Sequence, residues 1–195
     1  MRVWRLMEER DIARFPRPVF HRIPNFVGAA KAARRLGELP EYKAAKAVFC
    51  NPDAPQRPVR EMVLRDGKRL VMATPRLQKG FLILDPSTIS RSSIPEASTI
   101  RGAFKHGRIV EPSEVKVELF VTGSVAVSLN GGRLGKGSGY SDKEYALLKE
   151  SGGVSATALV VTTVHGVQIV EQIPQDAWDV RVDMIVTPTK TIRVA

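Results

Sequence analysis

The chain has 195 residues, which is enough for one well-buried domain and short for two. Apolar residues make up 43% of it, yet no run of about eighteen apolar residues occurs, so a membrane-spanning helix is excluded. The net charge of +10 comes entirely from residues 1–80, with 18 Lys/Arg against 8 Asp/Glu, because residues 81–195 hold 12 of each. This basic N-terminal part favours an anionic partner, with a merely solvated basic surface as the alternative.

Two features predict a cytoplasmic protein. Glu8, Glu9 and Asp11 interrupt any apolar run after the first residue, which argues against a signal peptide. The single cysteine, Cys50, excludes an intrachain disulfide and a cysteine-built zinc site. Because Cys50 follows an apolar run, we expect a buried thiol at a strand end and not a reactive one.

The first elements in chain order are helical. Residues 4–12 predict a short helix that ends before Pro16 and Pro18. Residues 14–24 are rich in prolines and basic residues and predict an ordered loop. Alanine-rich residues 27–38 predict the next helix.

Strands then begin to alternate with helices. Residues 44–49 predict a strand and residues 59–64 a helix, and residues 69–73 and 81–84 predict strands buried on both faces. Residues 85–113 show no clear pattern and form either a lid or a surface excursion.

The second half of the chain is richer in β-branched residues. Strands are predicted at 115–122, 124–129, 158–164, 167–173 and 182–186, and a helix at 142–150. Together these elements predict one α/β domain over residues 1–195, with a mostly parallel sheet covered on both sides.

A glycine-rich loop separates the strand 124–129 from the helix 142–150. It holds five glycines within residues 131–139, which lets the backbone approach a ligand closely. Ser141 and Glu144 have the spacing of a capping box, which predicts the helix start at this point. The unpaired N–H groups of the first helical turn would then face the loop and favour an anion.

Charged residues strengthen this prediction. Arg133 and Lys136 can contact phosphate oxygens, and Asp142 can hold Mg²⁺ beside them. The loop is not a P-loop, because no glycine stands five residues before the pair Gly135–Lys136 and no Ser/Thr follows Lys136. The alternative is a glycine-rich turn between strands.

A second polar cluster lies nearer the C-terminus. His165 and Gln168 follow the predicted strand 158–164, and ligands of open α/β sheets bind at the carboxyl ends of strands. We therefore expect them to line the same crevice as the glycine loop, although a strand-end histidine bonded to backbone is the alternative for His165. Asp179 and Asp183 flank the start of the last predicted strand.

Residues 133–142 read RLGKGSGYSD and resemble the R-x-G-x-G-x-G-Y-Y-D signature of 5-formyltetrahydrofolate cyclo-ligases. Gln168, Ile173-Pro174 and residues 179–183 resemble the closing Q…IP…HD-x-x-VD segment of that family, and the resemblance spans residues 115–188. The N-terminal half is similar to the branch of methenyltetrahydrofolate synthetase domain-containing proteins. That similarity lies in residues 15–18, 21–26 and 74–77.

The resemblance implies a three-layer α/β/α fold of the ribose-5-phosphate isomerase and CoA-transferase type. It also implies ATP- and Mg²⁺-dependent cyclisation of 5-formyltetrahydrofolate, in which ATP phosphorylates the formyl oxygen and N10 then closes the ring and expels phosphate. The implied nucleotide-binding residues are Arg133, Gly135, Lys136, Gly137, Ser138, Gly139 and Tyr140. The implied catalytic residues are Arg133, Tyr140 and Asp142, the substrate ligands Tyr140, His165 and Gln168, and the metal ligands Asp142 and Asp179.

The chain departs from the family at several positions. Trp4 stands where the family's N-terminal arginine is expected, and residues 50–57 lack the glutamate that meets the substrate. Ser141 replaces the second tyrosine of the signature and Trp178 replaces the histidine before Asp179. The chain thus retains the family's residues in the phosphate-binding half of the site and differs from them in the folate-binding half. An ATP-coupled enzyme with another substrate, or a nucleotide- or RNA-binding protein with a vestigial site, are the alternatives, although no RRM, KH or zinc-finger pattern is present.

Overall fold

A large mixed sheet forms the centre of the computed structural model, which describes residues 2–194. Its eight strands lie in the order β11-β10-β8-β5-β1-β2-β3-β4. They are β1 (Ala47–Cys50), β2 (Arg69–Ala73), β3 (Phe81–Leu84), β4 (Arg108–Val110), β5 (Val117–Thr122), β8 (Val154–Thr163), β10 (Met184–Val186) and β11 (Thr191–Arg193). The five central strands, from β10 to β2, run parallel, whereas β11, β3 and β4 join antiparallel at the edges. The predicted α/β fold with a mostly parallel sheet is confirmed.

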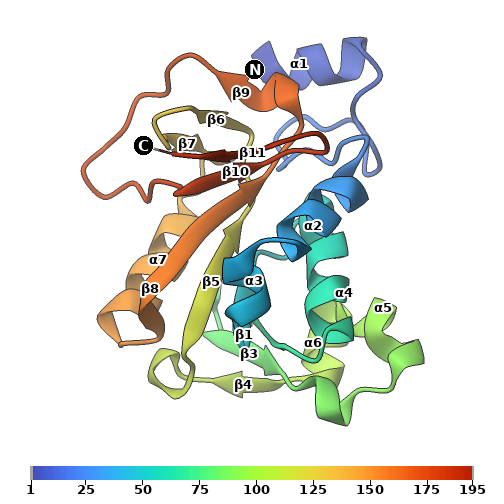
Figure 1. Cartoon of the computed structure of the whole chain (residues 1–195), viewed down its shortest axis with the longest axis vertical. Coiled ribbons are helices and arrows are strands. Elements are labelled where there is room, and N and C mark those ends of the chain that lie inside the picture. The colour runs from blue at the N-terminus through green and yellow to red at the C-terminus, as the bar shows by residue number, and fades with distance from the viewer. Residues whose placement is uncertain (1, 195) are drawn as a thin grey trace.

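Helices cover both faces of this sheet (Figure 1). The helices are α1 (Arg2–Glu9), α2 (Ala29–Gly37), α3 (Pro40–Ala44), α4 (Arg57–Arg65), α5 (Ile94–Ala97), α6 (Ile100–His106) and α7 (Tyr140–Glu150). One face packs against α2, α4, α5 and α6, and the other packs against α7. None of the helices within residues 2–194 is long and apolar enough to cross a membrane.

A second, three-stranded sheet completes the layer that contains α7. It consists of β6 (Ala126–Ser128), β7 (Arg133–Leu134) and β9 (Ile169–Val170) in the order β7-β6-β9. The predicted strands at 124–129 and 167–173 therefore belong to this small sheet, and the second is only two residues long because a 3₁₀ turn occupies residues 166–168.

The central strands are apolar along their whole length because both faces of the sheet are covered. In β5, Leu119 and Val121 face the core beneath α2 and α4, whereas Phe120 faces α7. Phe120 stacks on Phe49 of β1 with ring centroids 4.1 Å apart and meets Tyr145 of α7 edge-on at 5.1 Å. This packing fixes α7, and with it the end of the glycine loop, over the carboxyl ends of β1 and β5.

Residues 85–113, which have no clear sequence pattern, contain α5, α6 and the edge strand β4. These elements are too short for a periodic apolar pattern to reveal them. The Thr99 side chain caps α6 by accepting a hydrogen bond from the Gly102 N–H at 3.0 Å. The segment is neither a long lid nor a structureless excursion, and Ile100 at the start of α6 reaches the cavity described next.

Candidate functional site

A cavity of about 590 Å³ lies at the carboxyl ends of β1, β2 and β5, beside the glycine loop. Its walls come from residues 51–53 after β1, residues 73–76 at the end of β2, Gly123 after β5, and nine residues from 133 to 144. Ile23 and Ile100 add apolar contacts. Its location matches the binding crevice that open α/β sheets place outside the carboxyl ends of their strands.

The glycine loop runs from β7 to α7 along one wall of the cavity. Gly137 has a φ of 96° and Gly139 a φ of 65°, a region in which residues with a Cβ are strained. Gly139 is the residue before α7, and no side chain caps the helix among the residues described. Part of the first-turn backbone N–H groups thus stays available for an anion at the cavity wall.

The predicted capping box of Ser141 and Glu144 is wrong. Because Gly139 turns the chain into the helix early, Ser141 is already the second helical residue and cannot cap it. Its hydroxyl instead lies 2.7 Å from the Thr122 hydroxyl and 3.3 Å from Asn51 Oδ1. The Glu144 carboxylate also turns toward Asn51 rather than toward the helix start.

Arg133 and Asp142 form a buried ion pair at the loop's base. The guanidinium Nη2 lies 2.6 Å from Asp142 Oδ1, and the Arg133 side chain is only 4% exposed. The backbone N–H of Val180 also donates to Asp142 Oδ1, at 3.1 Å. Arg133 Nε is buried and has no partner within residues 2–194. Arg133 therefore holds the carboxylate in place and retains one free donor.

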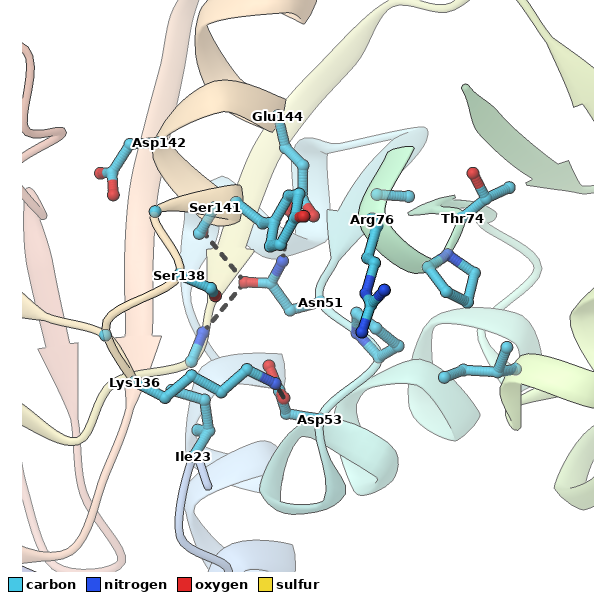
Figure 2. Close-up of a pocket in the computed structure, with 18 of the residues that line it drawn as sticks. Ile23, Asn51, Asp53, Thr74, Arg76, Lys136, Ser138, Ser141, Asp142 and Glu144 are labelled. Atoms are coloured by element: carbon cyan, nitrogen blue, oxygen red, sulfur yellow. Dashed lines mark hydrogen bonds and ion pairs between the residues drawn. The ribbon is translucent and has the colours of Figure 1, made fainter. Parts of the chain in front are cut away.

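Lys136 reaches across the mouth of the cavity. Its Nζ lies 3.7 Å from Asp53 Oδ1, and Figure 2 shows the side chain extended toward that carboxylate. Burial raises the pKa of Asp53, and the neighbouring Lys136 partly offsets this effect. The pair joins the loop to the turn after β1, so an entering phosphate would compete with Asp53 for the ammonium group.

Asn51, at the cavity floor, is the centre of a buried hydrogen-bond network (Figure 2). Its Oδ1 accepts from the Gly123 N–H at 3.1 Å, and its Nδ2 donates to Glu144 Oε2 at 2.7 Å. Glu144 is 6% exposed, and burial raises its pKa to about 8. The raised pKa favours the protonated form of this carboxyl.

A buried arginine supports the same floor. Arg60 of α4 is 3% exposed and donates to the carbonyl oxygens of Asn51 at 2.6 Å, Asp53 at 2.9 Å and Ser98 at 2.7 Å. Burial lowers the pKa of this guanidinium. The three carbonyl contacts fix the turn after β1 to α4 and to the end of α5.

Arg76 faces the cavity from the wall opposite the glycine loop (Figure 2). It adopts a left-handed conformation with a φ of 55°. Thr74 supports this turn, because its hydroxyl donates to the Gly80 carbonyl at 2.9 Å and accepts from the Lys79 N–H at 3.0 Å. Asn51, Asp53, Glu144 and Arg76 were not among the predicted site residues. The only sequence signal for the first two was their position directly after a buried strand.

His165 and Gln168 do not line the cavity, so the expectation that they share a crevice with the glycine loop is wrong. They cap the 3₁₀ turn after β8: Gln168 Oε1 accepts from the His165 N–H at 2.7 Å, and His165 Nδ1 accepts from the Val167 N–H at 3.3 Å. Gln168 also donates to the Ser124 carbonyl at 2.9 Å. Both side chains thus have a structural role, because they satisfy the backbone groups of the turn that follows β8.

The two predicted metal ligands lie on neighbouring segments but face different hollows. Asp142 lines the cavity, whereas Asp179 lines a separate depression and accepts a hydrogen bond from the Asp176 N–H at 2.8 Å. No cluster of three or more His, Cys, Asp or Glu side chains with metal-binding geometry occurs within residues 2–194. Asp142 Oδ2 is free of hydrogen bonds in that range and fits a Mg²⁺ ion held mainly by phosphates and water.

Comparisons with known proteins identify similar sequences and a similar fold. A model of the 5-formyltetrahydrofolate cyclo-ligase family matches residues 1–188. The methenyltetrahydrofolate synthase domain-containing proteins of Mus musculus and Bos taurus are 45% and 43% identical over 98% and 97% of the chain. The chain spans about half the length of these curated relatives, 53% and 51%. The solved 5,10-methenyltetrahydrofolate synthetase of Aquifex aeolicus has the same fold, with a TM-score of 0.63 and 23% identity over 99% of this chain and 91% of the other.

Proposed function

The chain belongs to the 5-formyltetrahydrofolate cyclo-ligase family, and from this premise we propose that it binds MgATP on the glycine loop and uses it to cyclise a formyl-pterin. The reaction closes a ring on 5-formyltetrahydrofolate, or on a related formyl-pterin, to give the methenyl form with release of ADP and phosphate. The observation that carries the proposal is the uncapped start of α7 behind Gly137 and Gly139, at the wall of the cavity.

The phosphate half of this site rests on positive charge and free N–H groups. Lys136 and the α7 start supply them at the wall, and Arg133 retains an unpaired Nε beside its ion pair. Such a set of donors stabilises the charge that spreads over a transferring phosphoryl group. Mg²⁺ would neutralise phosphate charge, and Asp142 is the residue that would hold it, with Asp179 as a second candidate on the adjacent segment.

The pterin half would be the opposite part of the cavity. A volume of about 590 Å³ lies in the range of about 300–1,000 Å³ typical of small-molecule sites. Tyr140, Ile23 and Ile100 offer apolar surface to a ring, while Asn51 and Glu144 offer polar contacts at the floor. The chain's own contribution is then to align the formyl oxygen with the nucleotide and to exclude water.

The basic surplus of residues 1–80 does not call for a separate function. Arg60 is buried and bonded to three carbonyls, and Arg17 pairs with Glu8 at 2.7 Å and Asp11 at 2.9 Å. Lys68 donates to backbone carbonyls near the start of β1. Several of these cations thus have structural partners, and we do not propose RNA binding from the charge alone.

Isothermal titration of MgATP into the purified chain, with Gly137→Val and a matched control, tests the nucleotide site. Gly137 and Gly152 both have positive φ and no atom within 4 Å of the position that a Cβ would take, but Gly152 lies past the far end of α7. Gly137→Val should abolish MgATP binding, whereas Gly152→Val should retain it with a similar loss of stability. Equal MgATP affinity of wild type and Gly137→Val would refute the loop as the nucleotide site.

Turnover of 5-formyltetrahydrofolate tests the proposed cyclisation reaction. Wild type with MgATP and 5-formyltetrahydrofolate should produce the methenyl chromophore and one phosphate per product. Binding of MgATP without turnover of any formyl-pterin would contradict the cyclo-ligase assignment and leave an ATP-coupled enzyme with a different substrate.

A further inference from the structure

Arg76 brings a positive charge to the cavity that nothing within residues 2–194 neutralises. The cavity is lined by three basic residues, Arg76, Arg133 and Lys136. Arg133 pairs with Asp142 at 2.6 Å. Lys136 lies 3.7 Å from Asp53. No hydrogen bond or ion pair in that range engages the Arg76 side chain, although a guanidinium is always charged and carries five N–H donors. The missing partner is therefore an anion that the ligand would supply.

The turn that carries Arg76 is braced on two sides. β2 and β3 pair antiparallel on either side of it, so residues 74–80 form a closed hairpin loop. Inside the loop, the N–H and the hydroxyl of Thr74 both donate to the Gly80 carbonyl, at 3.0 and 2.9 Å. Outside it, Lys79 Nζ lies 5.8 Å from the centre of the Phe104 ring on α6. The guanidinium thus extends from a turn with a defined position.

Arg76 lies toward solvent, apart from the floor and from the glycine loop. It is an exposed residue, whereas Asn51 and Glu144 at the floor are 4% and 6% exposed. Figure 2 shows it on the wall opposite Lys136 and Ser138. A ligand that fills the cavity from the floor outward therefore meets this cation where it emerges into water. Such a gradient suits a neutral ring at the inner end and an anionic group at the outer end, because a charge is costly to bury.

The position of Arg76 favours a carboxylate of the substrate over a phosphate of the nucleotide. Both anions match the two parallel N–H donors of a guanidinium, so the chemistry of the pair does not discriminate between them. The nucleotide phosphates, however, have their own donors on the other wall, in Lys136 and the uncapped start of α7. Arg76 is thus left for a different anionic group.

We propose that Arg76 is a specificity residue that binds a carboxylate at the outer end of the ligand, so that the site selects formyl-pterins with an acidic tail over those without one. The inference rests on the proposed function, because it takes a pterin ring to be what fills the floor. 5-Formyltetrahydrofolate ends in a glutamate, whose two carboxylates are well separated from the ring. The ion pair would form at the rim, so it contributes to binding and not to ring closure.

The test compares two ligands that differ in the charge of the tail: 5-formyltetrahydrofolate and its diamide, in which both glutamate carboxylates are carboxamides. Each is titrated calorimetrically into the whole chain with Mg²⁺ and a non-hydrolysable ATP analogue. Wild type should bind the dicarboxylate about tenfold more tightly than the diamide. Arg76→Gln should bind both ligands with the affinity that wild type has for the diamide.

Two variants serve as controls for charge and for the turn. Arg76→Lys should keep part of the preference, because an ammonium group supplies the charge without the paired donors of a guanidinium. Lys79→Gln removes a cation of the same turn that does not line the cavity, and it should match wild type. Raising the ionic strength should reduce the preference of wild type and leave Arg76→Gln unchanged.

Turnover gives a second readout that a merely structural role would not reproduce. Arg76→Gln should raise the KM for 5-formyltetrahydrofolate about tenfold at an unchanged kcat, and should leave the KM for the diamide as in wild type. A fall in kcat with an unchanged preference for the dicarboxylate would contradict the proposed role.

The outcomes separate this inference from the proposed function. MgATP affinity of Arg76→Gln equal to that of wild type supports the assignment of Arg76 to the substrate. The same preference for the dicarboxylate in wild type and Arg76→Gln, or a loss of MgATP affinity in its place, overturns this inference alone. No binding of either ligand to wild type overturns both this inference and the pterin part of the proposed function.

Discussion

Replacing Glu144 by Gln should stabilise the protein increasingly as pH rises. Folding raises the pKa of this carboxyl from its ordinary 4.5 to about 8, because the side chain is buried. The folded state thus binds its proton more tightly than the unfolded chain does. The resulting stability is fully present below pH 4.5 and is lost as pH rises through about 8.

The size of the stability difference between wild type and Glu144→Gln follows from the interval between the ordinary pKa of 4.5 and the raised pKa of about 8. Between pH 5 and pH 7 the unfolding free energy of wild type should fall, through this group, by about 1.4 kcal/mol per pH unit. Glutamine has no such dependence, so the advantage of Glu144→Gln should grow by about 3 kcal/mol over those two units, as an upper value for a group that keeps some contact with water. Any fixed offset from the new amide beside Asn51 is independent of pH.

Urea unfolding of both proteins at pH 5, 6, 7 and 8.5 measures this difference directly. The gap should widen up to about pH 8 and then stay constant. Glu150→Gln, on the exposed side of α7, should follow wild type at every pH. Parallel stability curves for wild type and Glu144→Gln would refute the reasoning, because they would mean that Glu144 is already ionised in the folded protein at pH 5.

Three further predictions concern stability and reactivity. Cys50 is fully buried and its thiol pKa is raised to about 12 by burial, so it should not react with a thiol-specific disulfide reagent until urea unfolds the chain; rapid labelling of native protein would contradict this. Arg133→Met leaves the Asp142 carboxylate without its partner and should lower the unfolding free energy by about 3 kcal/mol, whereas a loss below about 0.5 kcal/mol would show that the pair is dispensable. Gly102→Ala places a Cβ 1.8 Å from the Glu96 carbonyl oxygen and should cost about 3 kcal/mol in urea unfolding, and an unchanged midpoint would show that α5 and α6 separate freely.

Local patterns predicted the parts of the structure that local physics determines. The apolar runs at 69–73 and 81–84 match β2 and β3, because strands buried on both faces are apolar throughout. The glycine loop and the helix after it were predicted as well, since glycine adopts the positive φ of Gly137 and Gly139 without the strain that a Cβ brings. These features depend on residues that are close in sequence.

The floor of the cavity escaped prediction because distant residues build it. Asn51 and Glu144 are 93 positions apart, and Asn51 and Gly123 are 72 positions apart. The S-x-x-E spacing at Ser141 fits a capping box locally, but the Asn51 amide competes for the same glutamate. No pattern in a single sequence reveals which of the two partners wins.

The two sides of the cavity differ in rigidity, and Arg60 supports the more rigid one. Its three carbonyl contacts tie the floor to α4, so the shape presented by Asn51 and Glu144 changes only if the core itself opens. The glycine-loop side is held by the Arg133–Asp142 ion pair at its base and by a 3.7 Å contact between Lys136 and Asp53 at the mouth, and Gly137 has nothing within 4 Å of its Cβ position. Discrimination between ligands thus falls to the floor, whereas differences in ligand size are absorbed by the glycine loop.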